Sequence, residues 1–288
     1  RLLRQSFALY LAPAVIEKML SSNKPPALGG EMRNVTVYFS DIADFSSIAE
    51  KIPPVELVAA MNEYLSAMTD VIEAHGGFVD KYFGDAIVAV FGAPLDDPHH
   101  ATNAVRAALR CAAALGTLDR VTAAFGAAVR QRIGLNSGAA LVGNIGSRRR
   151  FNYTVMGDVV NLASRLEGAN RLYGTTVLAS HTTVALTGNA FIWRELDAIR
   201  VKGRTEAVRI FEPLGVAGEI AADVLARAHA YAEGLTRYRA RDFAAAAEQF
   251  ARVAAEDPPS ALLLARVREL AREPPGPQWE PVTAQEEK

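Results

Sequence analysis

Apolar and polar residues follow one another along the chain in patterns that predict a body of strands and helices. Residues 35–42 are rich in β-branched and aromatic side chains, which is typical of a buried strand, and the run ends in acid. Two apolar runs, 78–83 and 86–91, are separated by a Gly-Asp pair and predict a β-hairpin. Between these strands, residues 53–77 predict a helix, because apolar positions recur with a helical period from a proline pair to a glycine pair.

The alternation of helices and strands continues through the middle of the chain. Helices are predicted at 101–115 and 157–170, and strands at 129–135, 139–145, 150–156, 175–179, 191–202 and 207–212. Because hairpins interrupt the alternation, we expect an α+β body with a mixed or antiparallel sheet, and not a doubly wound parallel one.

The composition changes near residue 216 to alanine, arginine and glutamate with a helical period, which predicts an all-α region with helices at 220–239 and 243–255. Four residues have the spacing of a tetratricopeptide unit: Gly234, Ala246, Phe250 and Pro258. Because one such unit cannot bury its own apolar face, we expect it to pack on the body or on a protein partner. The chain after Pro274 is expected to be loose, with Trp279 as a candidate anchor.

At the other end, apolar residues at 7, 11, 15 and 19 predict a short amphipathic helix, and proline and glycine pairs after it predict a linker. We therefore divide the chain into an N-terminal helix and linker (1–30), a body (31–215) and a helical C-terminal region (216–288).

Charge and cysteine content argue against several kinds of function. The 288 residues include 31 Lys and Arg and 32 Asp and Glu, so the net charge is −1 and a nucleic-acid partner is not expected. One cysteine excludes a disulfide scaffold and a cysteine-based zinc site. No apolar run reaches the ~18 residues that a membrane span requires.

Two aspartates are placed where their carboxylates can meet. Asp41 ends the strand 35–42 and Asp85 lies in the hairpin turn, so both reach one sheet edge if strand and hairpin pair. Neighbouring carboxylates repel each other, and a divalent ion relieves this; magnesium with substrate phosphates suits such a pair. In the alternative interpretation, Asp41 caps the following turn and Asp85 is an ordinary turn residue.

A second polar set lies on the helix predicted at 157–170. Asn161 and Arg165 are four residues apart and share one helix face, and Asp158 is expected to cap the helix start. Taken alone, an amide beside an arginine is typical of a solvated helix surface.

Other polar groups favour structural roles. The cluster Asp96, Asp97, His99 and His100 favours a helix cap over a metal site, because it directly precedes an alanine-rich helix. Three arginines, 148–150, favour a solvated hairpin tip over a phosphate contact. Cys111 falls in a helical apolar pattern and is expected in the core.

Four segments occur in the order seen in the class III adenylate cyclases: FSDIADFSSIAE, DKYFGDAIVAVFG, GLNSGAALVGNIGS and YTVMGDVVNLASRLE. The chain resembles that family over residues 33–213. The resemblance implies a catalytic domain with a ferredoxin-like mixed sheet and flanking helices. It also implies a head-to-tail homodimer with active sites at the subunit interface.

The resemblance implies a role for each residue that matches a family motif. Asp41, Asp85 and the backbone carbonyl of Ile42 match the ligands of two Mg²⁺ or Mn²⁺ ions per site. The remaining matches concern the nucleotide: Lys81 reads adenine, Thr154 stands where many relatives have its aspartate partner, Asn161 orients the ribose, Arg165 stabilises the transition state and Lys202 grips the terminal phosphates. One protomer would supply the metal aspartates and its partner the nucleotide-binding residues.

The function expected from these matches is conversion of ATP to 3′,5′-cyclic AMP and pyrophosphate, by in-line attack of the ribose 3′-hydroxyl on the α-phosphate. The hydroxyl of Thr154 can accept from the adenine amino group, and it can also donate to guanine O6. A guanylate cyclase therefore stays open as an alternative, as does a cyclase-fold module that binds nucleotide without turnover. By analogy with relatives that carry threonine here, activation by bicarbonate is a further hypothesis.

The first residues suggest a place in a longer protein. The chain begins at Arg1, and FALYLAPAVIEKML resembles the segment that joins the catalytic domain to an upstream sensor in receptor-type cyclases. We expect a cytoplasmic chain that is part of a longer protein, for which a membrane anchor is one option.

Overall fold

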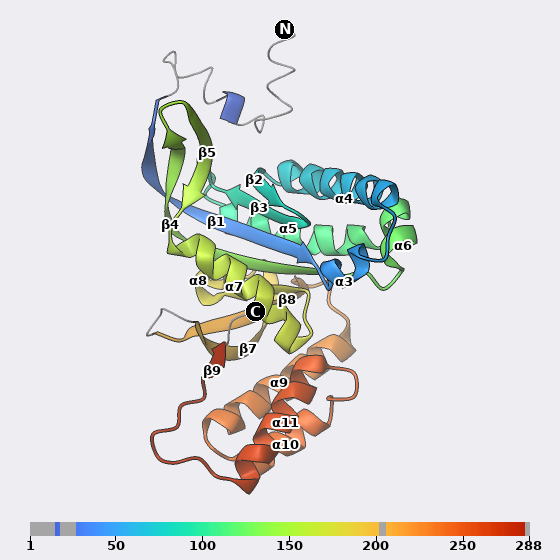
Figure 1. Ribbon diagram of the computed structural model, residues 1–288. Helices are drawn as coiled ribbons and strands as arrows, with labels where there is room; N and C mark the ends of the chain where they lie inside the picture. Colours follow the sequence, from blue (N-terminus) through green and yellow to red (C-terminus); the bar gives the residue numbers. More distant parts are fainter. Residues whose placement is uncertain (1–14, 18–26, 202–205, 286–288) are drawn as a thin grey trace.

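The computed structural model describes residues 15–17, 27–201 and 206–285, and within these ranges nine strands form one mixed sheet (Figure 1). The strand order is β2-β3-β1-β4-β6-β8-β7-β9, with β5 paired to β4. The strands are β1 Gly29–Ile42, β2 Gly77–Phe83, β3 Ala86–Phe91, β4 Gln131–Ser147, β5 Arg150–Met156, β6 Val177–Ser180, β7 Phe191–Val201, β8 Val208–Val216 and β9 Thr283–Gln285. β1 is antiparallel to β3 and β4, whereas β6 is parallel to β4. The predicted α+β class with a mixed sheet is confirmed.

Helices cover both faces of the sheet. They are α3 Phe45–Ala49, α4 Pro54–Ala74, α5 His100–Leu115, α6 Asp119–Phe125, α7 Asp158–Tyr173, α8 His181–Leu186, α9 Ala222–Arg239, α10 Phe243–Ala251 and α11 Pro258–Arg272. Because side chains of a strand alternate between faces, Tyr38 of β1 packs into the core beneath α4 and α5, whereas Val37 packs into the core beneath α7 (Figure 1). The central strands are therefore buried on both faces, which holds their ends in fixed positions.

The strands predicted at 129–135 and 139–145 are one strand, so the predicted break between them is wrong. β4 pairs with β1 over fourteen consecutive positions from Gly29 to Ile42. The glycine at 134, inside this pairing, allows α7 to lie close, because a Cβ there would overlap the backbone of Ala163 and Glu167. This glycine therefore reflects close packing of α7 on β4, and not a turn.

The helical C-terminal region packs on the body, as its unburied apolar face required. Tyr231 and Phe250 share one core with Tyr173 of α7 and Leu196 of β7. Gly234 of α9 faces the ring of Phe250, which a Cβ would approach to 2.8 Å.

The expectation of a loose chain after Pro274 is wrong. The Trp279 ring packs edge-on against the rings of Tyr238 and Phe243 at 5.4 and 5.5 Å, and β9 then pairs with β7 in parallel. Trp279 is thus the anchor that the sequence offered as a candidate.

Two expectations concern the N-terminus and membranes. Of the predicted N-terminal helix, residues 15–17 are described and helical, and the rest lies outside the described ranges. Among the described residues, no helix combines the length and apolar character of a membrane span.

Candidate active site

The structure brings Asp41 and Asp85 to one end of the sheet. Asp41 is the penultimate residue of β1, and Asp85 follows Gly84, whose φ of +61° makes the tight turn between β2 and β3. The backbone N–H of Ile42 donates to Asp85 Oδ2 at 2.8 Å, so the turn is fastened to the end of β1. Burial, with a smaller contribution from the charge of Asp41, raises the pKa of Asp85. This pair is called the acidic edge below.

A protein cation already faces this edge. Arg132 of β4 lies opposite Asp41 in the strand register and donates to both its carboxylate oxygens, at 3.0 and 3.2 Å. The same guanidinium lies 3.4 Å from Glu167 Oε1 on α7. Sequence reasoning missed Arg132, because it lies 91 residues after Asp41 and only the register of β1 with β4 places the two side by side.

The oxygen atoms at the acidic edge fit a divalent ion that is coordinated partly by the protein and partly by a substrate. Asp41, Asp85 and the carbonyl of Ile42 present oxygen atoms here, and oxygen is the ligand type that magnesium prefers. Across the described residues, no group of three or more His, Cys, Asp or Glu forms a cage for a metal. An ion at this edge would therefore complete its coordination with water or phosphate oxygens.

A second cluster joins β2 to β5. Lys81 Nζ donates to Thr154 Oγ1 at 3.0 Å, and the Thr154 hydroxyl donates to Asp80 Oδ2 at 2.8 Å. Lys81 Nζ lies 3.2 Å from the same Asp80 oxygen. Thr154 is 7% exposed and the side chain of Asp80 only 1%, whereas that of Lys81 is 39% exposed. The structure thus brings Lys81 and Thr154 together, and it adds Asp80, which sequence reasoning missed. These three residues are called the base cluster below.

Burial raises the pKa of Asp80, and hydrogen bonds from Thr154 together with the charge of Lys81 oppose that rise. A buried carboxylate of this kind depends on its partners to stay ionised.

The N-terminal half of α7 carries Asn161 and Arg165 one turn apart, with Asn161 exposed and Arg165 half-buried. The expectation that Asp158 caps this helix is wrong: Gly157, with φ of +142°, is the N-cap, and it makes no side-chain cap hydrogen bond. Asp158 is the first helical residue, where an acid interacts favourably with the positive end of the helix dipole. Lys202 lies outside the described residues.

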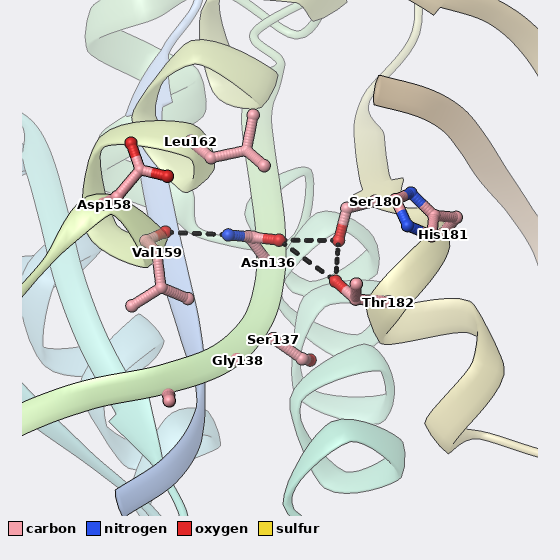
Figure 2. Close-up of a pocket in the computed structure, with 10 residues that line it drawn as sticks. Asn136, Ser137, Gly138, Asp158, Val159, Leu162, Ser180, His181 and Thr182 are labelled. Carbon is pink, nitrogen blue, oxygen red and sulfur yellow. Dashed lines mark hydrogen bonds between the residues drawn. The ribbon is translucent and has the colours of Figure 1, made fainter. Parts of the chain in front are cut away.

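The start of α7 is fixed from β4. Asn136 Nδ2 donates to the carbonyl of Val159 at 3.0 Å, and the Ser180 hydroxyl donates to Asn136 Oδ1 at 2.7 Å (Figure 2). These residues line a cavity of about 200 Å³ beside Asp158 and His181. The network holds in place the turn that precedes Asn161.

The other polar groups of the sequence have structural partners. Asp97 accepts from the backbone N–H of His99 and from Asn103 at the start of α5, whereas His100 points inward to Thr36 at 2.7 Å. Residues 148–149 form the turn between β4 and β5, so the predicted hairpin tip is confirmed. Cys111 is buried in α5, as predicted, and burial raises its pKa to about 12.

Comparison with known proteins agrees with this architecture. The family model described as "Adenylate and Guanylate cyclase catalytic domain" matches residues 29–211. Adenylate cyclase 1 of Rhizobium meliloti (strain 1021) is 39% identical over 212 residues, which are 73% of this chain and 32% of that relative. The chain thus spans about a third of the length of that relative.

Two solved structures show the same fold at similar identity. The guanylyl cyclase Cya2 has a TM-score of 0.61 at 34% identity and covers 67% of this chain and 97% of its own. The adenylyl cyclase CyaB from P. aeruginosa has a TM-score of 0.60 at 31% identity and covers 67% of this chain and 100% of its own. Both base preferences occur on this fold, so side chains and not the backbone must decide between them. The chain belongs to the family of adenylate and guanylate cyclase catalytic domains.

Proposed function

We propose that the chain is an adenylate cyclase that converts ATP to 3′,5′-cyclic AMP and pyrophosphate. The observation that carries this proposal is the hydrogen bond between Lys81 and Thr154, the two residues that we propose read the base. Lys81 can donate to ring nitrogen N1 of adenine, where guanine carries an N–H, and Thr154 can accept from the adenine amino group. The name of the Rhizobium relative supports the same substrate.

Asp41, Asp85 and the carbonyl of Ile42 are the proposed ligands of two Mg²⁺ or Mn²⁺ ions. Bound there, such ions lower the pKa of the ribose 3′-hydroxyl and neutralise the triphosphate. Burial and the charge of Asp41 both disfavour ionised Asp85, so these carboxylates gain from a cation beside them.

Asn161 and Arg165 are proposed to act on the ribose and on the α-phosphate. Negative charge builds on the oxygens of that phosphorus as pyrophosphate leaves, so a fixed guanidinium stabilises the transition state more than the ground state. Asn161 is exposed one turn earlier on α7, which supports the proposal that it orients the ribose. Lys202 is proposed to hold the terminal phosphates.

We further propose that two copies form the site head to tail. One protomer contributes the acidic edge, and its partner contributes Lys81, Thr154, Asn161, Arg165 and Lys202. The exposure of Lys81 and Asn161 supports this arrangement, because both side chains are accessible to a second copy.

Complementation tests both the activity and the shared site. Asp41→Ala and Arg165→Ala should each lower cyclic AMP formation from ATP and Mn²⁺ to about 1% of the wild-type rate or less. When the two variants are mixed and allowed to exchange, half of the dimers contain one intact site, so about a quarter of the wild-type turnover should return. Exchange is verified independently by fluorescence transfer between labelled subunits, and a mixture of Asp41→Ala with Asp85→Ala, which restores no site, is the matched control. Absence of recovery in exchanged dimers would refute the shared site.

A guanylate cyclase is the alternative that Cya2 represents. Parallel assays with ATP and GTP, each with Mg²⁺ and with Mn²⁺, decide between the two. Better turnover of GTP would overturn the adenylate assignment, and turnover of neither would favour a nucleotide-binding module.

The C-terminal region is proposed to be a tetratricopeptide-like unit that also docks a protein. The close approach of Gly234 to Phe250 and the burial of Ala246 support the motif. Bicarbonate activation, and a cytoplasmic place within a longer protein, stay part of the proposal; bicarbonate added at fixed pH tests the former directly.

A further inference from the structure

We propose that Asp80 determines base specificity by holding the proton of the Thr154 hydroxyl, so that Thr154 presents only an acceptor to the base. This inference rests on the proposed function, and it removes the ambiguity of a hydroxyl that can also donate to guanine. Asp80 is a positioning residue in this role, because it acts on the nucleotide through Thr154.

A β-bulge makes the arrangement possible. In a regular strand, neighbours point to opposite faces, so Asp80 and Lys81 would be separated by the sheet. The pairing of β2 with β3 shifts register between Val79 and Lys81, which leaves Asp80 as the extra residue. Both Asp80 and Lys81 consequently reach the hydroxyl of Thr154 on β5.

The hydrogens and lone pairs of Thr154 and Lys81 determine which hydrogen bonds the base cluster can make with a nucleotide. A hydroxyl has one hydrogen and two lone pairs, and the hydrogen of Thr154 is given to Asp80 at 2.8 Å. An ammonium group has only donors, so Lys81 faces the nucleotide as a donor. The pair therefore presents one donor and one acceptor side by side.

Adenine matches this pattern and guanine opposes it. The adenine edge carries an acceptor at N1 and a donor in its amino group, which complement Lys81 and Thr154 respectively. Guanine places an N–H against the ammonium and the O6 acceptor against the lone pairs of Thr154. Sites that leave polar groups unpaired reject the wrong substrate strongly.

The burial of Asp80 makes the pattern hard to reverse. For Thr154 to donate to guanine O6, its hydroxyl must turn away from a carboxylate that is 1% exposed. Loss of that bond would leave a deeply buried carboxylate with one donor fewer, and a buried acceptor that loses its donor costs free energy.

The test compares kcat/KM for ATP with kcat/KM for GTP in the full chain with Mn²⁺. Asp80→Asn should lower the ratio of ATP to GTP by roughly 10–100-fold, because the amide can donate to Thr154 and free the hydroxyl to face guanine. The kcat for ATP should fall far less than in Arg165→Ala, since the acidic edge and α7 are unchanged.

Two variants separate this role from a general loss of structure. Asp257→Asn is the matched control, because Asp257 is also a buried carboxylate that accepts from a hydroxyl, Ser260, and from an arginine, Arg194. It should leave the ratio unchanged. The double variant Asp80→Asn with Thr154→Asp should restore the preference for ATP, because an ionised aspartate at 154 accepts without help.

These experiments distinguish failure of this inference from failure of the proposed function. An unchanged ratio in an active, folded Asp80→Asn chain overturns the inference and leaves the proposed function intact. If Asp80→Asn does not fold, Asp80→Ala replaces it, because it also releases the Thr154 hydroxyl: a lower ratio of ATP to GTP supports the inference, and an unchanged ratio overturns it. If even the wild-type chain turns over neither nucleotide, the proposed function fails. The ratio of ATP to GTP affinity by calorimetry then decides the inference, which survives only if Asp80→Asn changes it.

Discussion

The acidic edge and the base cluster belong to one chain but solve opposite electrostatic problems. At the acidic edge, the carboxylates of Asp41 and Asp85 lie beside the guanidinium of Arg132, which also approaches Glu167 of α7. In the base cluster, one carboxylate, Asp80, has both its cation and its hydroxyl donor within the chain. The carboxylates of the first region lie beside one another and share Arg132, whereas the carboxylate of the second has its own donors from Lys81 and Thr154.

Removing an acid from the acidic edge should have the largest effect on turnover. Asp41→Ala and Asp85→Asn are each expected to lower turnover by more than about 10³-fold, because the ions that neutralise the triphosphate lose a ligand. Cyclic nucleotide assays over a range of Mn²⁺ concentrations measure this. Full rescue by excess Mn²⁺ would show that the carboxylate only improves ion affinity.

The same Asp85→Asn variant should be more stable than the wild type when no divalent ion is present. The pKa of Asp85 is raised in the folded chain, so its favourable contribution exists below the ordinary value of 3.8 and is lost as pH rises through the folded pKa. Thermal melts in chelator between pH 4 and 8 should show a smaller decline for the variant than for the wild type. An identical decline would contradict the raised pKa of Asp85.

Some residues of the two regions can be predicted from the sequence alone. Those that cannot were missed for the same reason. Asp41 and Asp85 follow local signals, the end of an apolar run and a Gly-Asp turn. Arg132 and Asp80 have no local signal: one depends on the pairing of β1 with β4, and the other on a bulge in β2. Side chains positioned by register or by a bulge cannot be assigned from periodicity alone.

The same difference between local and long-range signals explains which helices and strands could be predicted. Long helices such as α4 and α5 follow a strong period and were predicted close to their bounds. The pairing of β9 with β7 involves three residues and depends on tertiary contacts, among them the hydrogen bond from Thr283 to Asp197 at 2.6 Å. No local sequence pattern predicts such a short strand.

The next largest effect is expected from Arg165. Arg165→Ala should lower kcat by ~10²–10³-fold with a smaller change in KM, because the guanidinium acts on charge that develops in the transition state. Steady-state kinetics with ATP separate the two parameters. An effect confined to KM would mean that Arg165 binds the ground state and that this part of the mechanism is wrong.

A change outside both regions should act through the position of α7. Gly134→Ala forces β4 away from the backbone of Ala163 and Glu167, and overpacking of this kind costs about 1–3 kcal/mol of stability. Turnover should fall together with the melting temperature, because α7 carries Asn161 and Arg165. Gly116→Ala is the matched control, since a Cβ there meets no atom within 4 Å.

The smallest effect on turnover is expected at Glu195, far along the chain from both regions. Burial raises the pKa of Glu195, but hydrogen bonds from Arg209 and Arg239 outweigh it and lower the value to about 2. Its contribution to stability is present above the ordinary pKa of 4.5 and is lost as pH falls toward about 2. Glu195→Gln should therefore flatten the loss of stability over that range, measured by chemical denaturation, and leave turnover at neutral pH unchanged.

A crystal structure of the chain with Mn²⁺ and a non-reactive ATP analogue tests the central claim most directly, because anomalous scattering locates the ions. We predict manganese between the carboxylates of Asp41 and Asp85, with the adenine of the same nucleotide held by Lys81 and Thr154 of a second copy. Carboxylates that point apart with no ion between them, or a base bound away from Lys81 and Thr154, would contradict the account.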